Sequence, residues 1–125
     1  MTKAKGRAEK PTAAASEGAD YLFLKSEYLQ RKVHLADIVY IEGMKDYAKV
    51  YITTDAHPVL SLISLKKLEE KLPPDRFMRI HRSFIIALDK IDRIERSQVI
   101  IQDQRITVGE QYRAAFNAFL ESRSV

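Results

Sequence analysis

Few residues in this sequence have the type and spacing that catalysis requires. The three histidines, the residue type that most often transfers protons near neutral pH, are scattered at positions 34, 57 and 81, and no HExxH motif occurs. The four glycines form no phosphate-binding loop, and cysteine is absent, which excludes thiolate nucleophiles, thiolate metal sites and disulfides. We therefore expect that the chain is not an enzyme and needs no cofactor or metal.

A cluster of basic residues carries the clearest chemical signal. Arginines at 76, 79 and 82 recur at three-residue spacing beside His81, and six Lys and Arg against three Asp and Glu fall between positions 76 and 96. In a regular strand, Arg79 and His81 would face one side and their neighbours the other, so an extended chain would bury one set of charges. A bend near His81 and Arg82 removes this conflict, and we expect a turn there.

An arginine at such a turn fits two roles. Its planar fork of donors suits bidentate hydrogen bonds to guanine O6 and N7, or to phosphate. Alternatively, it pairs with an acid such as Glu42 or Asp89 and stabilises the fold. The net charge of +4 permits an anionic partner, and residues 21–125 alone hold 17 Lys and Arg against 14 Asp and Glu. Spacing by itself leaves both roles open.

The elements that must position this cluster are mainly predicted strands. Branched and aromatic residues, often alternating with polar ones, indicate extended segments at 21–24, 28–35, 38–42, 47–53, 59–63, 77–88, 91–95, 99–102 and 105–108. Turns are expected at 43–46 and at Asp103 and Gln104. The middle of the protein is therefore expected to be rich in β structure.

Two helices are expected among these strands. Ser64 is suited to cap the first, whose leucines at 65, 68 and 72 share one face and which the prolines at 73 and 74 end. The second follows Gly109, and its apolar residues recur at three- and four-residue spacing. The residues expected in the core from this helix are Tyr112, Ala115, Phe116 and Phe119. The sequence predicts a mainly β domain with two small helices.

The size and composition indicate one folded domain. The 125 residues are 46% hydrophobic and 30% charged. Residues 1–20 hold almost no large apolar side chain, so we interpret them as a flexible linker or tail and residues 21–125 as the domain. The longest uncharged apolar stretch, 83–88, is too short to cross a bilayer, and no secretory signal is evident. We expect a cytoplasmic protein without membrane contact.

Several blocks together resemble the LytTR family of bacterial DNA-binding domains. The most specific is FMRIHRSF at 77–84, and the others are IVYIEG at 38–43, LKKLE at 65–69 and ITVGEQY at 106–112. In order and spacing they cover roughly residues 21–120. The resemblance implies stacked antiparallel sheets that bind double-stranded DNA through loops at one edge, as the output domain of a two-component response regulator and transcriptional regulator.

The resemblance places DNA contacts in three segments. The first segment is 45–49, where Lys45 and Lys49 would approach phosphates and Tyr47 would make a stacking or hydroxyl contact. The second segment is 81–83, where Arg82 would read bases. The third is Gln111 with its neighbour Arg113, and Gln111 would suit adenine N6 and N7. The expected DNA-binding residues are Lys45, Tyr47, Lys49, Arg79, His81, Arg82, Ser83, Gln111 and Arg113.

Structural roles remain open for four of these residues. Tyr47 could cover the sheet as a half-buried aromatic side chain, and Ser83 could bond the backbone of its own turn. His81 could support the neighbouring arginine, and Arg79 could form a structural ion pair.

Two positions depart from many members of the family. Glu110, after Gly109, places a carboxylate where phosphate would repel it. Asp46 stands where many relatives have Asn, and it could accept from cytosine N4 or orient Lys45. The third contact segment is therefore the least secure of the three.

The expected partners are double-stranded DNA and, from the resemblance, an N-terminal receiver domain outside this chain; a homodimer on direct repeats is also left open. An alternative function is a regulatory protein–protein module, in which edge strands and the apolar face of the terminal helix dock a partner. A third is a barrel that stacks single-stranded RNA on its tyrosines, although these alternate with core positions.

Overall fold

The computed structural model describes residues 20–125, so the predicted linker, residues 1–20, lies outside the described residues except for Asp20. The strands are β2 (Tyr21–Lys25), β3 (Gln30–His34), β4 (Ile38–Met44), β5 (Tyr47–Ile52), β6 (Val59–Ser61), β7 (Phe77–His81), β8 (Phe84–Ala87), β9 (Arg93–Glu95), β10 (Gln98–Ile101) and β11 (Gln104–Thr107). The helices are α2 (Leu65–Lys71) and α3 (Arg113–Arg123), with short 3-10 helices η1 (Leu35–Asp37), η2 (Leu88–Lys90) and η3 (Glu110–Tyr112).

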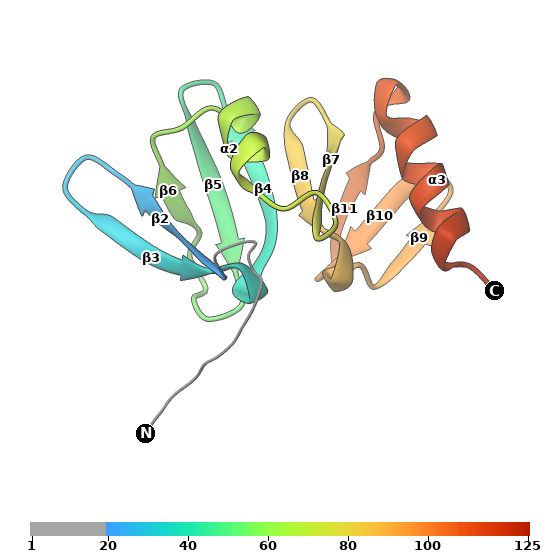
Figure 1. Cartoon of the computed structure of the whole chain (residues 1–125), viewed down its shortest axis with the longest axis horizontal. Helices are drawn as coiled ribbons and strands as arrows, with labels where there is room; N and C mark the ends of the chain where they lie inside the picture. The colour runs from blue at the N-terminus through green and yellow to red at the C-terminus, as the bar shows by residue number, and fades with distance from the viewer. Residues whose placement is uncertain (1–19) are drawn as a thin grey trace.

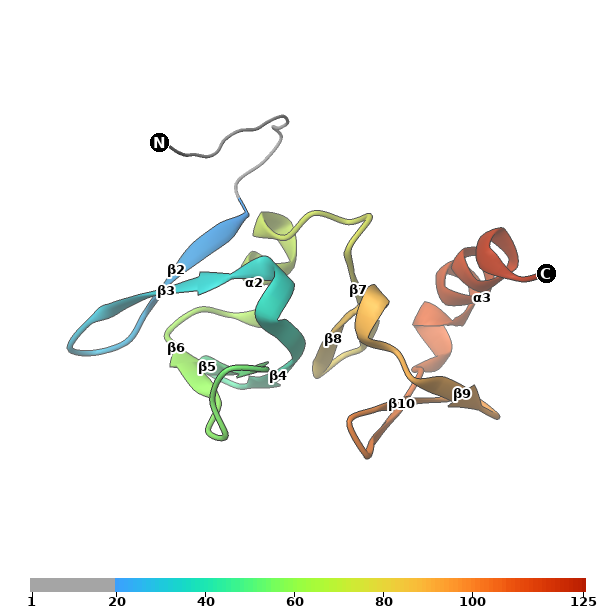
Figure 2. The ribbon, with the colours of Figure 1, turned by 90° about the horizontal axis from the view of Figure 1, so that it is seen from below.

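The strands of residues 20–125 form three antiparallel sheets that follow one another along the long axis of the molecule (Figure 1). The central sheet has the strand order β6-β5-β4-β8-β7. The β2–β3 sheet lies at one end, and the sheet β11-β10-β9 lies at the other end beside α3, as the view from below also shows (Figure 2). The predicted mainly β fold of stacked antiparallel sheets, with a short mid-chain helix and a C-terminal helix, is confirmed.

The central sheet is buried on both faces, which explains the continuous apolar run in β4. Ile38 and Ile41 pack in a first hydrophobic cluster with α2 and the β2–β3 sheet. Val39 and Tyr40 pack in a second cluster with the three-stranded sheet and α3. The pairing with β5 shifts register at Val39, and such a bulge lets two consecutive residues point the same way. Both clusters therefore hold the central sheet, and with it the turns at its ends.

α2 forms as its sequence predicts. The Ser64 hydroxyl accepts a hydrogen bond from the amide of Lys67 at 3.2 Å, and this cap satisfies one of the free amides of the first turn. The leucines at 65, 68 and 72 are all buried in the first cluster. Each such buried leucine contributes roughly 1.5–3 kcal/mol relative to an exposed one. α2 is therefore firmly attached to the central sheet.

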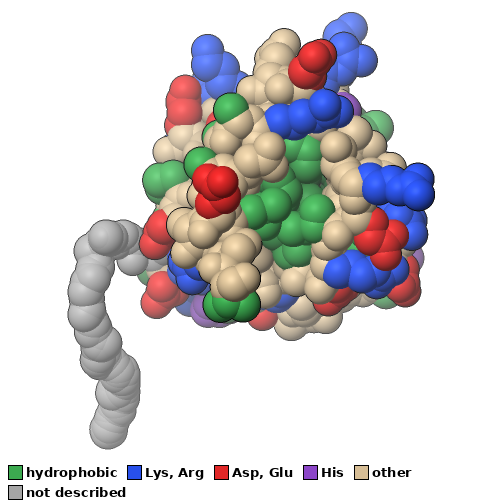
Figure 3. Space-filling model, turned by 90° about the vertical axis from the view of Figure 1, so that its right-hand side faces the viewer, with side chains coloured by type: hydrophobic (Ala, Val, Ile, Leu, Met, Phe, Trp, Pro, Cys, Tyr) green, Lys and Arg blue, Asp and Glu red, His purple; other side chains and the backbone are tan. Residues whose placement is uncertain are grey.

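α3 packs Phe116 into the second cluster, with Phe119 and Leu120 half-buried against it. The prediction that Ala115 lies in the core is wrong, because Leu120 completes the apolar stripe and Ala115 falls outside it on the exposed side. On the α3 side of the molecule, hydrophobic side chains remain visible in the middle of the face, with charged ones around them (Figure 3). Among residues 20–125, no helix has the length and apolar character needed to cross a bilayer.

Other differences from the sequence-based boundaries are small. The turn between β10 and β11 lies at Gln102 and Asp103, one residue earlier than predicted. Both residues have positive φ, 46° and 66°, which suits the twist of a two-residue hairpin, whereas Gln104 pairs with Ile101 in the ladder. β3 begins at Gln30 rather than 28, and the predicted strands 59–63 and 91–95 shorten to β6 and β9.

Candidate nucleic-acid interface

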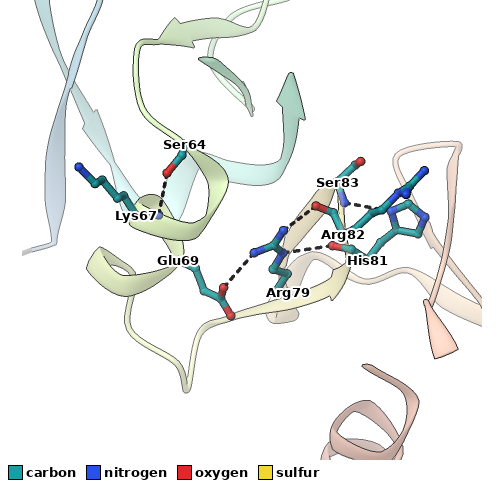
Figure 4. Close-up of polar contacts among 7 residues, drawn as sticks. All are labelled: Ser64, Lys67, Glu69, Arg79, His81, Arg82 and Ser83. Carbon is teal, nitrogen blue, oxygen red and sulfur yellow. Dashed lines mark hydrogen bonds and ion pairs between the residues drawn. The ribbon is translucent and has the colours of Figure 1, made fainter. Parts of the chain in front are cut away.

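The basic block lies at the hairpin of β7 and β8. Arg79 pairs with Ile85 and His81 pairs with Phe84, so Ile80 is the extra residue of a β-bulge. The His81 ring lies 5.7 Å from the ring of Phe84, on the side of the second cluster that Ile80 also faces. Arg79 points to the other side, toward α2 (Figure 4). The bulge thus separates two side chains that a regular strand would place together.

The expected turn is present at Arg82 and Ser83. The tight turns at 45–46, 96–97 and 102–103 each contain a residue with positive φ, whereas neither Arg82 nor Ser83 has one. Two-residue hairpin turns favour left-handed residues because these match the twist of the strands. This turn therefore needs another source of stabilisation.

Hydrogen bonds from side chains supply it (Figure 4). Arg79 donates through Nε to the carbonyl of His81 at 3.3 Å and through Nη2 to the carbonyl of Arg82 at 2.6 Å. The Ser83 amide donates to Nδ1 of His81 at 3.0 Å. The remaining guanidinium nitrogen of Arg79, Nη1, lies 3.4 Å from Oε1 of Glu69 on α2. All three nitrogens of Arg79 are engaged, and its side chain is only 19% exposed.

Arg82, in contrast, is exposed. Its carbonyl accepts from Arg79, but its guanidinium forms no ion pair with any of residues 20–125. Neither acid considered from the sequence pairs with it. Oδ1 of Asp89 lies 3.8 Å from Nζ of Lys90, and Glu42 forms no ion pair within residues 20–125. The donors of Arg82 are therefore available to an external acceptor.

A row of aromatic rings supports the turn from the interior. The Phe84 ring lies 6.2 Å from that of Tyr40, which stacks on Tyr51 at 4.4 Å with an angle of 20° between the planes. Burial raises the pKa of Tyr40 to about 12, with further contributions from Tyr51 and Glu42. The row joins the second hydrophobic cluster to the ring of His81, so the turn is supported by packed aromatic side chains.

The β4–β5 hairpin lies directly beside this turn. The amide of Gly43 donates to the carbonyl of Ser83 at 2.8 Å. A Cβ atom at position 43 would lie 3.1 Å from Cδ2 and 3.2 Å from Cβ of Leu65, so α2 packs closely against the same glycine. The absence of a side chain at Gly43 therefore allows the hairpin, α2 and the Arg82 turn to come together.

The contact residues predicted in this hairpin differ in exposure. Lys45 is exposed in the tight turn, with a φ of 25°. Tyr47 is half-buried at the start of β5 and borders a small pocket with Leu60 and Leu62. Lys49 is half-buried two residues further along, opposite Glu42 in the register of β4 and β5. Of the three, Lys45 is thus the most exposed, and Tyr47 and Lys49 are half-buried.

The third predicted segment lies on the other side of the turn. The amide of Gly109 donates to the carbonyl of Ile80 at 2.7 Å. A Cβ atom at position 109 would lie 3.7 Å from Cα of His81 and 3.1 Å from the ring of Tyr112. This close approach brings η3 and the start of α3 next to the β7–β8 hairpin.

The side chains of this third segment are exposed at the same place. Gln111 is exposed in η3, and so is its neighbour Glu110. Arg113 begins α3 and donates through Nε to the carbonyl of Val108 at 3.4 Å, which leaves its other nitrogens free of partners within residues 20–125. The carboxylate of Glu110 therefore stands among the residues predicted to contact DNA.

The three segments meet at one edge of the molecule, at the top in Figure 1. The backbone hydrogen bonds of Gly43 and Gly109 connect the two outer segments to the central turn. The exposed charged residues of this edge are Lys45, Asp46, Arg82, Glu110 and Arg113. The edge carries cations on all three segments, with two carboxylates between them.

Sequence reasoning missed Glu69 and the backbone links of the two glycines. Glu69 belongs to the LKKLE block, but its contact with Arg79 depends on how α2 packs on β7, which spacing does not reveal. Glycine at positions 43 and 109 was the available signal for close approach. Within residues 20–125, no three His, Asp or Glu side chains gather as a metal site would require.

Comparison with known proteins agrees with this arrangement. The family model of the LytTr DNA-binding domain matches residues 30–121, which include all three segments of the edge. A solved LytTr DNA-binding domain from Bacillus cereus, from a protein described as a methyl-accepting/DNA response regulator, has a TM-score of 0.68 and 26% identity. That match covers 82% of this chain and 98% of the solved chain.

Curated relatives match over about half of this chain. The CO-responsive transcriptional regulator RcoM of Rhodospirillum rubrum is 41% identical over 56 residues, 45% of this chain and 23% of that protein. The sensory transduction protein LytT of Bacillus anthracis is 41% identical over 63 residues, 50% of this chain and 25% of that protein. The chain thus spans about a quarter of the length of these relatives. Since the family model covers most of the chain and a solved LytTr domain shares its fold, the chain belongs to the LytTR family of DNA-binding domains.

Proposed function

We propose that this domain recognises specific sequences of double-stranded DNA through the edge described above, with Arg82 as the main base-reading residue. The observation that carries the proposal is the setting of Arg82: an exposed guanidinium without an ion-pair partner among residues 20–125, on a turn whose backbone is held from both sides. A guanidinium on a rigid support suits guanine O6 and N7 in the major groove, and such a contact discriminates bases by roughly 1–3 kcal/mol.

The other exposed groups supply affinity. Lys45 and Arg113 lie on the outer segments and would contact phosphates on either side of the groove, together with Lys49 at a greater distance from the edge. Gln111 is exposed beside Arg113 and suits adenine N6 and N7. Tyr47 would add a stacking or hydroxyl contact. Phosphate contacts of this kind strengthen binding to every duplex and are weakened by salt.

His81 and Ser83 affect DNA binding indirectly, because they hold the turn that carries Arg82 in shape. Nδ1 of His81 already accepts the Ser83 amide, and the Ser83 carbonyl accepts from Gly43, so both residues are bound to the protein itself. We assign them the role of holding the Arg82 turn.

We further propose that the domain is the cytoplasmic output part of a longer regulator. Relatives that carry such a region are named transcriptional or sensory transduction regulators, and this chain spans about a quarter of their length. A receiver domain attached through residues 1–20 would supply control, and two copies would bind direct repeats. Light scattering of the full regulator with and without duplex DNA would measure the number of copies bound.

Selection of duplexes from a random pool tests the proposal. We expect an enriched motif with a guanine whose replacement weakens binding of the unchanged chain but not of an Arg82→Ala variant. Enrichment of no motif, together with equal affinity for heparin, would show general attraction to polyanions and overturn the proposal.

The protein–protein alternative receives less support. Phe116 of α3 is buried in the second cluster and Phe119 and Leu120 are half-buried against it, so part of the apolar face of this helix is used inside the domain.

A further inference from the structure

We infer that Glu69 is a positioning residue that determines DNA sequence specificity through Arg79, without touching DNA itself. The inference rests on the proposed role of Arg82 and adds a residue from α2 to it. It also assigns Arg79, one of the residues expected from the sequence to contact DNA, to the support of the turn.

A chain of contacts links Glu69 to the Arg82 turn through Arg79 (Figure 4). Two nitrogens of Arg79 donate to the carbonyls of His81 and Arg82, at 3.3 and 2.6 Å, and the third faces Glu69 at 3.4 Å. One guanidinium therefore joins the two consecutive peptide groups at the turn to a carboxylate on another element. The plane of the guanidinium fixes the relative directions of these bonds.

The Arg82 turn differs in conformation from the other two-residue turns of residues 20–125. The other three two-residue hairpin turns of the described chain use residues with positive φ, and this one does not. Its backbone lacks the intrinsic match to strand twist that left-handed residues provide. The path of the backbone at Arg82, and hence the direction of its side chain, depends on the hydrogen bonds that Arg79 donates and on the one that His81 accepts.

Glu69 restrains the side chain of Arg79. An unrestrained arginine has many rotamers, and a nearby phosphate would attract its charge. Glu69 draws one nitrogen toward α2, which keeps the other two directed at the turn. α2 is a firm anchor because Leu65 and Leu68 are buried in the first cluster. Loss of Glu69 would free Arg79 to follow the DNA backbone, and the turn would lose its support.

A matched pair of variants tests this inference. Glu70 is also exposed on α2, next to Glu69, and forms no ion pair with residues 20–125. Glu69→Ala and Glu70→Ala remove the same charge from the same helix, so the loss of negative charge by itself should strengthen binding to all duplexes to a similar extent in both variants. The measured quantity is the specificity ratio, the affinity for a duplex enriched by the unchanged chain divided by that for its scrambled sequence.

We expect Glu69→Ala to lower this ratio about threefold, the range of an exposed ion pair, and Glu70→Ala to leave it unchanged. Arg79→Lys keeps the charge but loses the fork, so the ratio should fall about tenfold while the slope of affinity against salt stays the same. Thermal unfolding of each variant confirms that the domain is folded at the assay temperature. An equal ratio for Glu69→Ala and Glu70→Ala would overturn the inference.

Combination with Arg82→Ala separates this inference from the proposed function. If Glu69 acts through Arg82, then Glu69→Ala should not lower the ratio further in a chain that already carries Arg82→Ala. A further fall would show that Glu69 acts elsewhere and would overturn the inference. No loss of specificity from Arg82→Ala alone would instead refute the base-reading role of Arg82, and the role of Glu69 with it.

Discussion

The amide of Gly43 donates a hydrogen bond to the carbonyl oxygen of Ser83 at 2.8 Å, so the β4–β5 hairpin is joined to the turn that carries Arg82. On the opposite side, the amide of Gly109 donates to the carbonyl of Ile80 at 2.7 Å. Main-chain hydrogen bonds do not depend on side-chain rotamers, so the spacing of the three segments is set by the backbone. DNA that binds across this edge would meet a surface formed in advance, which lowers the entropic cost of association.

Arg82 and Lys49 are expected to have different effects on binding. Arg82→Ala should lower the preference for the enriched duplex about tenfold or more, because a bidentate base contact is lost. Lys49→Ala should weaken all duplexes alike and reduce the slope of log affinity against log salt by about one unit. Fluorescence anisotropy at several salt concentrations measures both quantities. If Arg82→Ala bound the enriched duplex as well as the unchanged chain at moderate salt, the base-reading assignment would be wrong.

His81 is expected to tolerate asparagine better than alanine. The side-chain oxygen of Asn can accept the Ser83 amide as Nδ1 of His81 does, whereas Ala leaves that amide without its partner. The loss of one such hydrogen bond costs about 0.5–1.5 kcal/mol of folding stability. In urea unfolding, the free energy of unfolding of His81→Asn should therefore lie near that of the unchanged chain, and that of His81→Ala should be lower. Fluorescence anisotropy should give the same order for DNA specificity. Equal losses of specificity in both variants would indicate that the imidazole itself reads a base.

The sequence predicted the elements whose signals are local. Alternating burial along β5, the leucine face of α2 and its Ser64 cap all follow from residue spacing, and the structure agrees. The turn at Arg82 was also predictable, because a continuous strand would have buried charges. Resemblance to the LytTR family predicted the three loop segments. The residue patterns that indicate strands and helices could not by themselves show that these segments meet at one edge.

The features that escaped prediction depend on packing between distant elements. Glu69 and Arg79 are ten residues apart on a helix and a strand, and their contact requires the tertiary position of α2. The bulge at Ile80 arises from the register of β7 against β8, which the sequence of one strand does not fix. Ala115 was misplaced because the apolar stripe of α3 continues to Leu120 instead.

Burial of Tyr40 predicts a loss of stability at alkaline pH. Its pKa is raised from 10.0 to about 12 in the folded chain, first by burial and then by the neighbouring Tyr51 and Glu42. Between these pH values the unfolded chain has released the proton and the folded chain retains it, so the free energy of unfolding falls as pH rises. Below pH 10 this contribution is fully present.

Urea unfolding followed on both sides of pH 10 measures this effect, and Tyr40→Phe is the matched variant because it removes the titrating group and keeps the ring. Tyr40→Phe should lose less stability than the unchanged chain over this range. An identical decline in the two proteins would contradict the prediction.

Leu68 is expected to link fold stability to DNA recognition. Its side chain is 1% exposed in the first cluster, so Leu68→Ala should leave a cavity and destabilise the domain by about 2–5 kcal/mol in urea unfolding. Lys71→Ala, at an exposed position of the same helix, should change stability by less than about 0.5 kcal/mol. Because α2 carries Glu69, loosening its packing should also lower the specificity ratio under conditions where the domain is still folded. A Leu68→Ala protein that is folded, less stable and fully specific would show that the Arg82 turn keeps its shape without a firmly packed α2.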